Sequence, residues 1–262
     1  MNKESMMRKT IIAGNWKLNK TIQESVDTVK KLISELNGAQ LPEVVICPVY
    51  TSLAAVAEAL KKSTLHLGAQ DLYWEESGAF TGEVSATLIK DAGCQYVIIG
   101  HSERRQFFGE TETSVNAKIK AALKAGLTPI VCCGETLKER ENGQMNEVLN
   151  RHIQGALRSL SYEEVLQCVI AYEPVWAIGT GKVATPDQAQ EAHAYIRQII
   201  TQLYSEEVSN QITIQYGGSV KPDNIVELIG QPDVDGALIG GASLEAETFA
   251  RIIKSSAEVK VS

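Results

Sequence analysis

The sequence predicts an α/β protein, a (β/α)8 barrel in which an outer ring of helices encloses eight parallel strands. Three observations support this prediction: eight short apolar runs of strand length, segments with helical spacing between successive runs, and a length of 262 residues. A barrel of this kind typically needs about 250 residues, which is close to the size that a single core can reach.

The predicted strands recur along the whole chain. In chain order they are residues 10–13, 44–47, 65–69, 96–99, 127–132, 168–172, 212–216 and 236–239. An open doubly wound sheet would also alternate strands with helices, but the GxGxxG fingerprint expected after its first strand is missing. The count of eight therefore favours the closed barrel.

Capping signals mark the starts of several predicted helices. Three helices begin with the capping-box pattern, in which a Thr precedes Glu or Gln by three residues: Thr21 with Glu24, Thr136 with Glu139, and Thr185 with Gln188. Pro186 suits the first position of the third of these helices, because proline has no backbone N–H to satisfy there.

Composition favours one domain and limits its partners. The chain has no Pro-, Ser- or Gly-rich linker, so we expect a single catalytic barrel over residues 9–262, preceded by an extension of residues 1–8. A net charge of −7 and a pI near 5.3 argue against nucleic-acid or anionic-membrane partners, which need a basic surface. The longest apolar runs are only strand-sized, which predicts neither a membrane span nor a signal peptide.

The five cysteines are an odd set without metal-ligand spacing, and most lie in apolar runs. We interpret Cys47, Cys94, Cys132, Cys133 and Cys168 as reduced core residues, so the sequence predicts a cytoplasmic protein with no metal site.

In a barrel of this type the chemistry lies on the loops that follow the strands. Glu173 emerges from the predicted strand 168–172, where one side of its carboxylate is shielded from water, and it suits a general base. The segment 174–182 begins with Pro174, contains Gly179 and Gly181, and is apolar between them. It is typical of a lid that excludes water, although a connection packed under a helix is the alternative.

Three polar groups follow earlier strands. Asn15 and Lys17 lie two positions apart, so continued extended geometry would place both on the side of the barrel mouth. Lys17 would be a fixed cation there; the alternative is a solvated loop lysine. His101 ends the fourth run, and the residues after it open a short helix whose positive end disfavours a charged imidazole. For Glu103 and the two arginines after it, the alternative to a role in the site is a cluster of salt bridges at the barrel rim.

Small residues follow the last two strands. Gly217, Gly218 and Ser219 follow the seventh strand, and Gly240 and Gly241 follow the eighth. Backbone N–H groups at such turns can approach an anion closely, and this pair of loops is the usual phosphate site of a barrel. Gly179 of the predicted lid could add another N–H.

Together these groups suit proton transfer next to a carbonyl in a phosphorylated substrate. A carboxylate would take the proton, and a neutral imidazole would donate a hydrogen bond to the developing enediolate oxygen. A lid would protect this intermediate, because an enediolate can lose a neighbouring phosphate in water.

The chain resembles the triosephosphate isomerase family from Lys9 to about Lys254. The resemblance is carried by segments in the family's order: residues 13–17 (AGNWK), 100–105 (GHSERR), 171–182, 216–220 and 235–244. It implies the TIM barrel, an isomerase of glycolysis and gluconeogenesis, no cofactor, and a triose phosphate substrate. The resemblance also implies a glutamate base, a neutral histidine and a closing lid, which are general features of that family.

The resemblance also assigns roles to individual residues. Glu173 would shuttle the proton, His101 would polarise the carbonyl oxygens, Lys17 with Asn15 would stabilise negative charge, and Glu103 would tether Lys17. The phosphate would be held by Gly179, Ser219, Gly240 and Gly241.

The family is typically dimeric, and residues Gln70 to Val84 fit the long loop that docks into its second subunit. A mobile surface loop is the alternative, but it would leave aromatic side chains exposed. Asp71 stands where the family usually has Asn, which puts the hydrogen bonds at the base of this loop in doubt.

Two rival functions remain open from the sequence. A barrel aldolase acting on phosphosugars would need a Schiff-base lysine at a strand exit, where the sixth strand offers Glu173. A non-catalytic barrel that only binds its ligand would contain the same motifs, because small misplacements can disable a complete site.

Overall fold

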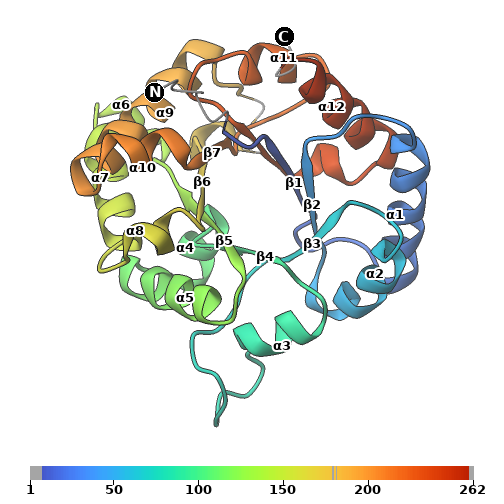
Figure 1. Cartoon of the computed structure of the whole chain (residues 1–262). Coiled ribbons are helices and arrows are strands. Elements are labelled where there is room, and N and C mark those ends of the chain that lie inside the picture. Colours follow the sequence, from blue (N-terminus) through green and yellow to red (C-terminus); the bar gives the residue numbers. More distant parts are fainter. Residues whose placement is uncertain (1–7, 179, 181, 260–262) are drawn as a thin grey trace, which may run out of the picture.

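Eight parallel strands close into a barrel in the computed structural model, which describes residues 8–178, 180 and 182–259 (Figure 1). Each strand pairs with the next one in the chain, and β8 pairs with β1. The strands are β1 (Ile11–Asn15), β2 (Glu43–Cys47), β3 (His66–Ala69), β4 (Tyr96–Ile99), β5 (Thr128–Cys133), β6 (Val169–Tyr172), β7 (Thr213–Tyr216) and β8 (Gly236–Ile239). The predicted (β/α)8 barrel is confirmed.

Helices surround the barrel on all sides (Figure 1). They are α1 (Ile22–Leu36), α2 (Leu53–Leu60), α3 (Ala86–Asp91), α4 (Ser102–Phe108), α5 (Glu112–Lys124), α6 (Leu137–Glu141), α7 (Met145–Ala156), α8 (Tyr162–Val165), α9 (Pro186–Leu203), α10 (Glu206–Gln211), α11 (Ile225–Ile229) and α12 (Ala246–Val259). Short 3-10 turns are η1 (Tyr50–Ser52), η2 (Val175–Ala177) and η3 (Gly241–Ser243). All three predicted capping boxes are present. None of the helices in the described ranges is long and apolar enough to cross a bilayer.

The core has two layers, because the strands are buried on both faces. Alternate strand residues fill the barrel interior, and the others pack between the sheet and the helices. Ile11 and Ala13 point inward, so Asn15 at the end of β1 does too. Ala171 also points inward, which directs Glu173, two residues later, toward the barrel mouth. All five cysteines are free and buried, as predicted.

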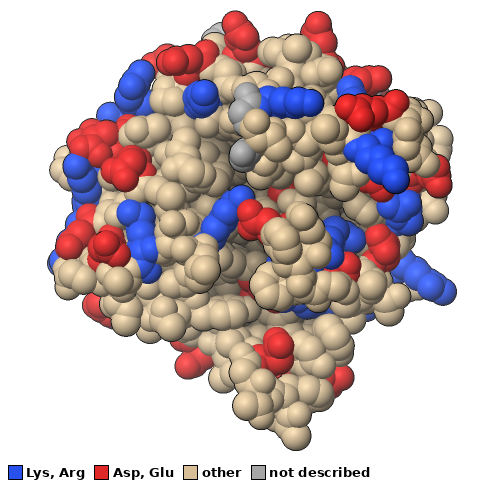
Figure 2. Space-filling view, turned by 180° about the vertical axis from the view of Figure 1, so that it is seen from behind, with Lys and Arg blue, Asp and Glu red and all other residues tan. Residues whose placement is uncertain are grey.

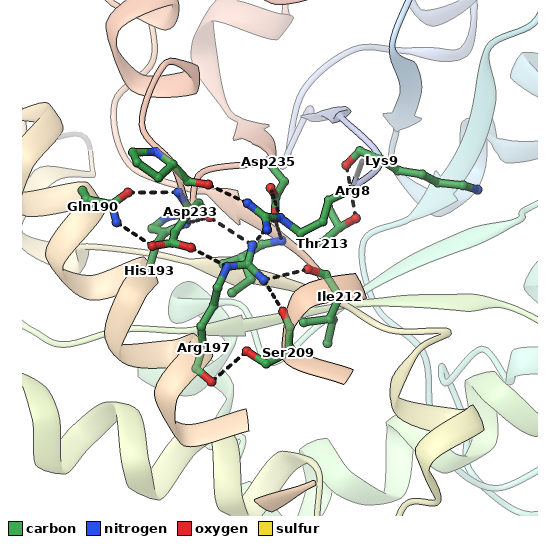
Figure 3. Close-up of polar contacts among 12 residues, drawn as sticks. Arg8, Lys9, Gln190, His193, Arg197, Ser209, Ile212, Thr213, Asp233 and Asp235 are labelled. Carbon is green, nitrogen blue, oxygen red and sulfur yellow. Dashed lines mark hydrogen bonds and ion pairs between the residues drawn. The ribbon is translucent and has the colours of Figure 1, made fainter. Parts of the chain in front are cut away.

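A charged cluster joins α9 to the loops before β7 and β8 (Figure 3). Because these loops precede the strands whereas Glu173 follows one, the cluster lies at the opposite end of the barrel from Glu173. Arg197 donates from Nε to Asp233 Oδ1 at 2.8 Å and pairs with Asp235, and Arg8 Nε lies 2.7 Å from Asp235 Oδ1. Buried charges are tolerated only when they are paired in this way. Sequence analysis did not foresee the cluster. Residues 1–7 lie outside the described residues, so the predicted extension of residues 1–8 stays a prediction.

Asp71 lies buried at the base of the loop that projects between β3 and α3 (Figure 1). Its carboxylate oxygens lie 2.6 Å from Lys118 Nζ and 2.9 Å from Arg104 Nη2, and Glu110 contacts the same two cations. Ion pairs therefore replace the neutral hydrogen bonds that an Asn would make. Burial and the Glu110 charge raise the pKa of Asp71 from its ordinary value of 3.8 to about 6, although Lys118 and Arg104 oppose the shift.

This shift predicts a pH-dependent effect of Asp71→Asn on stability. A carboxyl whose folded pKa is raised contributes stability below its unfolded pKa and loses that contribution as the pH rises through the folded value. The variant lacks this loss. The difference in unfolding free energy, variant minus wild type, should therefore rise by roughly 1 to 3 kcal/mol between about pH 4 and pH 7. Urea denaturation at fixed protein concentration measures it, with the exposed Asp91→Asn as control; a flat or falling difference contradicts the prediction.

Candidate active site

Glu173 follows β6 and lies at the carboxyl end of the barrel, as predicted. Its backbone N–H donates to Cys133 O at 2.7 Å, and a Cβ placed on Gly217 would lie 3.0 Å from its Cγ. The end of β5 and the loop after β7 therefore hold the residue on two sides, and only 2% of its surface is exposed.

The Glu173 carboxylate is held by two residues at the start of α4, the N-cap His101 and the first helical residue Ser102. Oε1 lies 2.9 Å from His101 Nε2, and Oε2 accepts from the Ser102 backbone N–H at 2.9 Å. The Ser102 hydroxyl donates to Oε1 at 3.2 Å. Burial raises the pKa of Glu173, but His101 and the Ser102 N–H outweigh it, and the net pKa is lowered. Sequence analysis recognised Ser102 only as a helix opener and missed its role as a partner of Glu173.

His101 is the N-cap of α4. Gly100 has φ +71°, and this left-handed turn, which suits glycine, redirects the chain so that the imidazole meets Glu173. The Glu103 backbone N–H donates to Nδ1 at 3.2 Å, so Nδ1 acts as an acceptor and Nε2 carries the proton of the neutral ring.

The charge balance at His101 differs from the expectation. Burial lowers the pKa of His101, but the Glu173 charge and hydrogen bond outweigh it, so the net pKa is raised and not lowered as the helix end predicts. A carboxylate at 2.9 Å is a stronger influence than the partial charge of a helix end.

Lys17 lies at the barrel mouth, but the backbone that leads to it is not extended as the sequence analysis assumed. The extended geometry ends at Asn15, and Lys17 adopts φ +52° while its N–H donates to Asn15 Oδ1 at 3.0 Å. The condition of a continued extended chain is therefore not met, because the chain turns as soon as its ladder with β2 ends. Lys17 Nζ lies 2.5 Å from Glu103 Oε1, so it is not simply a solvated lysine.

The two glycine-containing loops reach the same mouth. A Cβ on Gly240 would lie 3.3 Å from Lys17 Cε, and Gly241 opens η3 beside open space. The Ser219 carbonyl accepts from Asn224 Nδ2 at 3.1 Å, which fixes the turn after β7. Gly179 lies outside the described residues.

The first part of the predicted lid is anchored from behind by Glu135, a fully buried residue that sequence analysis did not single out. Trp176 Nε1 and Tyr172 Oη donate to Glu135 Oε1 at 2.9 and 3.0 Å. Burial raises the pKa of Glu135, and these two donors oppose the shift. Closure of the segment 174–182 over the site stays a prediction.

The two arginines after Glu103 form ion pairs, Arg104 with Asp71 and Glu110, and Arg105 with Glu112. They therefore stabilise the rim, which was the alternative weighed for them. A hollow of about 720 Å³ opens beside Arg104, and its lining includes Asn15, Lys17 and His101. Within the described ranges, no group of three or more Asp, Glu, His or Cys residues could hold a metal ion.

Comparison with known proteins places this geometry in a family context. A family model described as triosephosphate isomerase matches residues 10–256. A triosephosphate isomerase of Endomicrobium trichonymphae is 54% identical over 250 residues, covering 95% of this chain and all of the relative. The relative of the same name from Geotalea uraniireducens is 55% identical over 250 residues with the same coverage. That from Moorella thermoacetica is 54% identical over 247 residues, or 94% of this chain and 98% of the relative.

Proposed function

Because the chain belongs to the triosephosphate isomerase family and interconverts glyceraldehyde 3-phosphate and dihydroxyacetone phosphate, a step of glycolysis, we propose that Glu173 and His101 perform its proton transfer. The observation that carries this proposal is the 2.9 Å contact between Glu173 Oε1 and His101 Nε2. It brings a base and a hydrogen-bond donor from two distant strands within reach of adjacent atoms of one small substrate.

In this proposal Glu173 releases Ser102 and His101 and takes a proton from the carbon next to the substrate carbonyl. His101 Nε2–H donates to the carbonyl oxygen and stabilises the enediolate that forms. The hydroxyl proton of the enediolate moves from its own oxygen to the former carbonyl oxygen, and Glu173 returns the abstracted proton to the carbon that carried the carbonyl. These two transfers complete the exchange of aldose and ketose.

Lys17 supplies the positive charge for the enediolate and the phosphate. Its contact with Glu103 supports a tethering role for that carboxylate, and Asn15 holds the turn that presents the lysine. A fixed cation in a partly buried mouth stabilises developing negative charge more than one in open water.

Ser219, Gly240, Gly241 and Gly179 form the proposed phosphate site. The closeness of Gly240 to Lys17 supports it, because both would meet the same anion.

The residues after Glu173 act as the lid that excludes water, and the reaction needs no cofactor or metal. An assay of the purified protein with glyceraldehyde 3-phosphate should show conversion to dihydroxyacetone phosphate; failure to convert would reject the catalytic proposal.

Borohydride treatment in the presence of substrate tests the aldolase alternative. No covalent adduct is expected at Lys17, because its ammonium group is paired with Glu103 and the residue that follows β6 is Glu173, not a lysine. Isomerisation without an adduct also excludes a barrel that only binds its ligand.

A homodimer is proposed on the projecting loop, residues 70–84. The loop stands away from the barrel in Figure 1, and the projection at the bottom of Figure 2 is mostly uncharged. Tyr73 stacks on Trp74 and Phe80 with ring centroids 4.2 and 4.8 Å apart, which leaves a preformed aromatic surface. Phe107 and Phe108 are also exposed. An exposed apolar surface of this kind favours docking on a second copy.

Sedimentation velocity at micromolar concentration should give twice the chain mass of 28.5 kDa. Phe80→Asp should shift the equilibrium toward monomer by placing a charge in the proposed interface. Leu203→Asp is the matched control, because Leu203 is 41% exposed and Phe80 40%, yet Leu203 ends α9, away from the loop. A monomeric wild type would reject the dimer.

The cellular setting is proposed from composition and from the surface. Five free, buried cysteines fit a reducing compartment, which supports a cytoplasmic protein. Lys and Arg are interspersed with Asp and Glu over the face in Figure 2, which fits a protein whose partner is a small phosphorylated substrate and not nucleic acid or a membrane.

A further inference from the structure

A second hollow lies behind Glu173, separate in its lining from the one beside Lys17. Its volume is about 280 Å³, and its wall includes Glu173, Gly134, Arg105 and His152. Neither the proposed chemistry nor the sequence motifs use His152, although it lies close to the proposed base.

Helix α7 directs His152 inward. The buried residues of this helix recur at helical spacing, and His152 lies on that face with only 8% of its surface exposed. The buried members are Met145, Val148, Leu149, His152, Ile153 and Ala156. The imidazole therefore points at the end of β5 and not at solvent.

The ring contacts the turn after β5. The Gly134 backbone N–H donates to His152 Nδ1 at 3.3 Å, and Nε2 lies 3.5 Å from Glu112 Oε1. Burial, together with the charges of Arg105 and Arg151, lowers the pKa of His152 to about 3. The ring is thus neutral at the pH at which an enzyme works, and Nδ1 remains an acceptor.

The same turn supports the main chain of Glu173. A Cβ on Gly134 would lie 1.7 Å from the Glu173 carbonyl oxygen, so only glycine allows this approach. The Glu173 N–H donates to Cys133 O at 2.7 Å, on the same side of the chain. Residues 133–134 therefore support the backbone of Glu173, the proposed base.

From this chain of contacts we infer that His152 is a positioning residue for Glu173. By accepting from the Gly134 N–H, its imidazole keeps residues 133–134 in place while the Glu173 carboxylate turns from Ser102 and His101 toward the substrate. The ring also forms part of the wall of the hollow behind the base. The inference rests on the proposed role of Glu173 as the base.

Steady-state kinetics of three variants test this inference. His152→Leu removes the acceptor and should lower kcat roughly tenfold with KM changed by less than about twofold, because a displaced base loses its aim while the phosphate contacts stay. His152→Asn places Oδ1 near the position of Nδ1 and should keep kcat within about threefold of wild type. His66→Leu, at the opposite end of the barrel, is the control and should change neither constant.

The inference is overturned if His152→Leu keeps the wild-type kcat, or if the Asn variant loses as much activity as the Leu variant. Should the Leu variant not fold, ring ¹⁵N NMR of the wild type decides, with the His152 signals assigned from their loss in the Asn variant. A proton on Nε2 and an accepting Nδ1 between pH 5 and 8 support it, whereas an imidazolium or a protonated Nδ1 overturns it. Full activity of Glu173→Gln would instead reject the proposed base itself.

Discussion

Replacement of Glu173 by Gln is expected to lower kcat about a thousandfold or more, while affinity for a phosphorylated inhibitor stays within about threefold. The amide has the shape of the carboxylate and can keep the Ser102 contacts, but it cannot accept a proton from carbon. The phosphate site and Lys17 do not depend on the carboxylate, so binding should survive its loss.

Turnover in both directions and inhibitor titration measure the two parts of this prediction. Glu35→Gln, an exposed carboxylate on α1, is the matched control and should behave as wild type. The pKa of His101 gives a second readout, because Glu173 is the main influence that raises it. This pKa should fall in the variant. Wild-type turnover in Glu173→Gln would contradict this prediction and show that another residue is the base.

The second large effect is expected for His101→Asn, with kcat lower by roughly 10²- to 10³-fold. Asn keeps an acceptor near the position of Nδ1 for the Glu103 N–H, so the start of α4 should stay intact. Its side chain ends short of the Nε2 position, and no donor then reaches the carbonyl oxygen. The loss should fall on kcat, because the enediolate needs this hydrogen bond more than the substrate does.

Infrared spectroscopy of bound dihydroxyacetone phosphate reports the same contact independently, since a donor to the carbonyl oxygen lowers its stretching frequency. The frequency should return toward its solution value in His101→Asn and stay unchanged in the control His66→Asn. A variant that keeps both turnover and the lowered frequency would remove His101 from the mechanism.

Local features of the fold were predictable because they depend on neighbours in the chain. The strands 96–99 and 236–239 were predicted with the ends that the structure has, and the Thr21 capping box is formed by residues three positions apart. Strand ends set by pairing were less predictable. The first strand was expected to end at residue 13, but its ladder with β2 continues to Asn15.

The residues of the candidate site also fall into those that the sequence shows locally and those that depend on long-range contacts. Sequence analysis found Glu173, His101 and Lys17, because an apolar strand that ends in a polar residue is visible in the chain itself. It missed Glu135, whose contacts with Tyr172 and Trp176 span about forty positions of the chain. A buried carboxylate directly after β5 was the available signal, and nothing local shows that two donors from β6 and η2 meet it.

By itself the sequence determined the barrel, the order of its strands and which residues stand at strand exits, since hydrophobic periodicity and capping are short-range effects. The tertiary structure alone decided which exits meet. It paired Glu173 with His101, paired Lys17 with Glu103 and set His152 behind the base. These contacts join residues on different strands and helices, and their distances exist only after the barrel has closed.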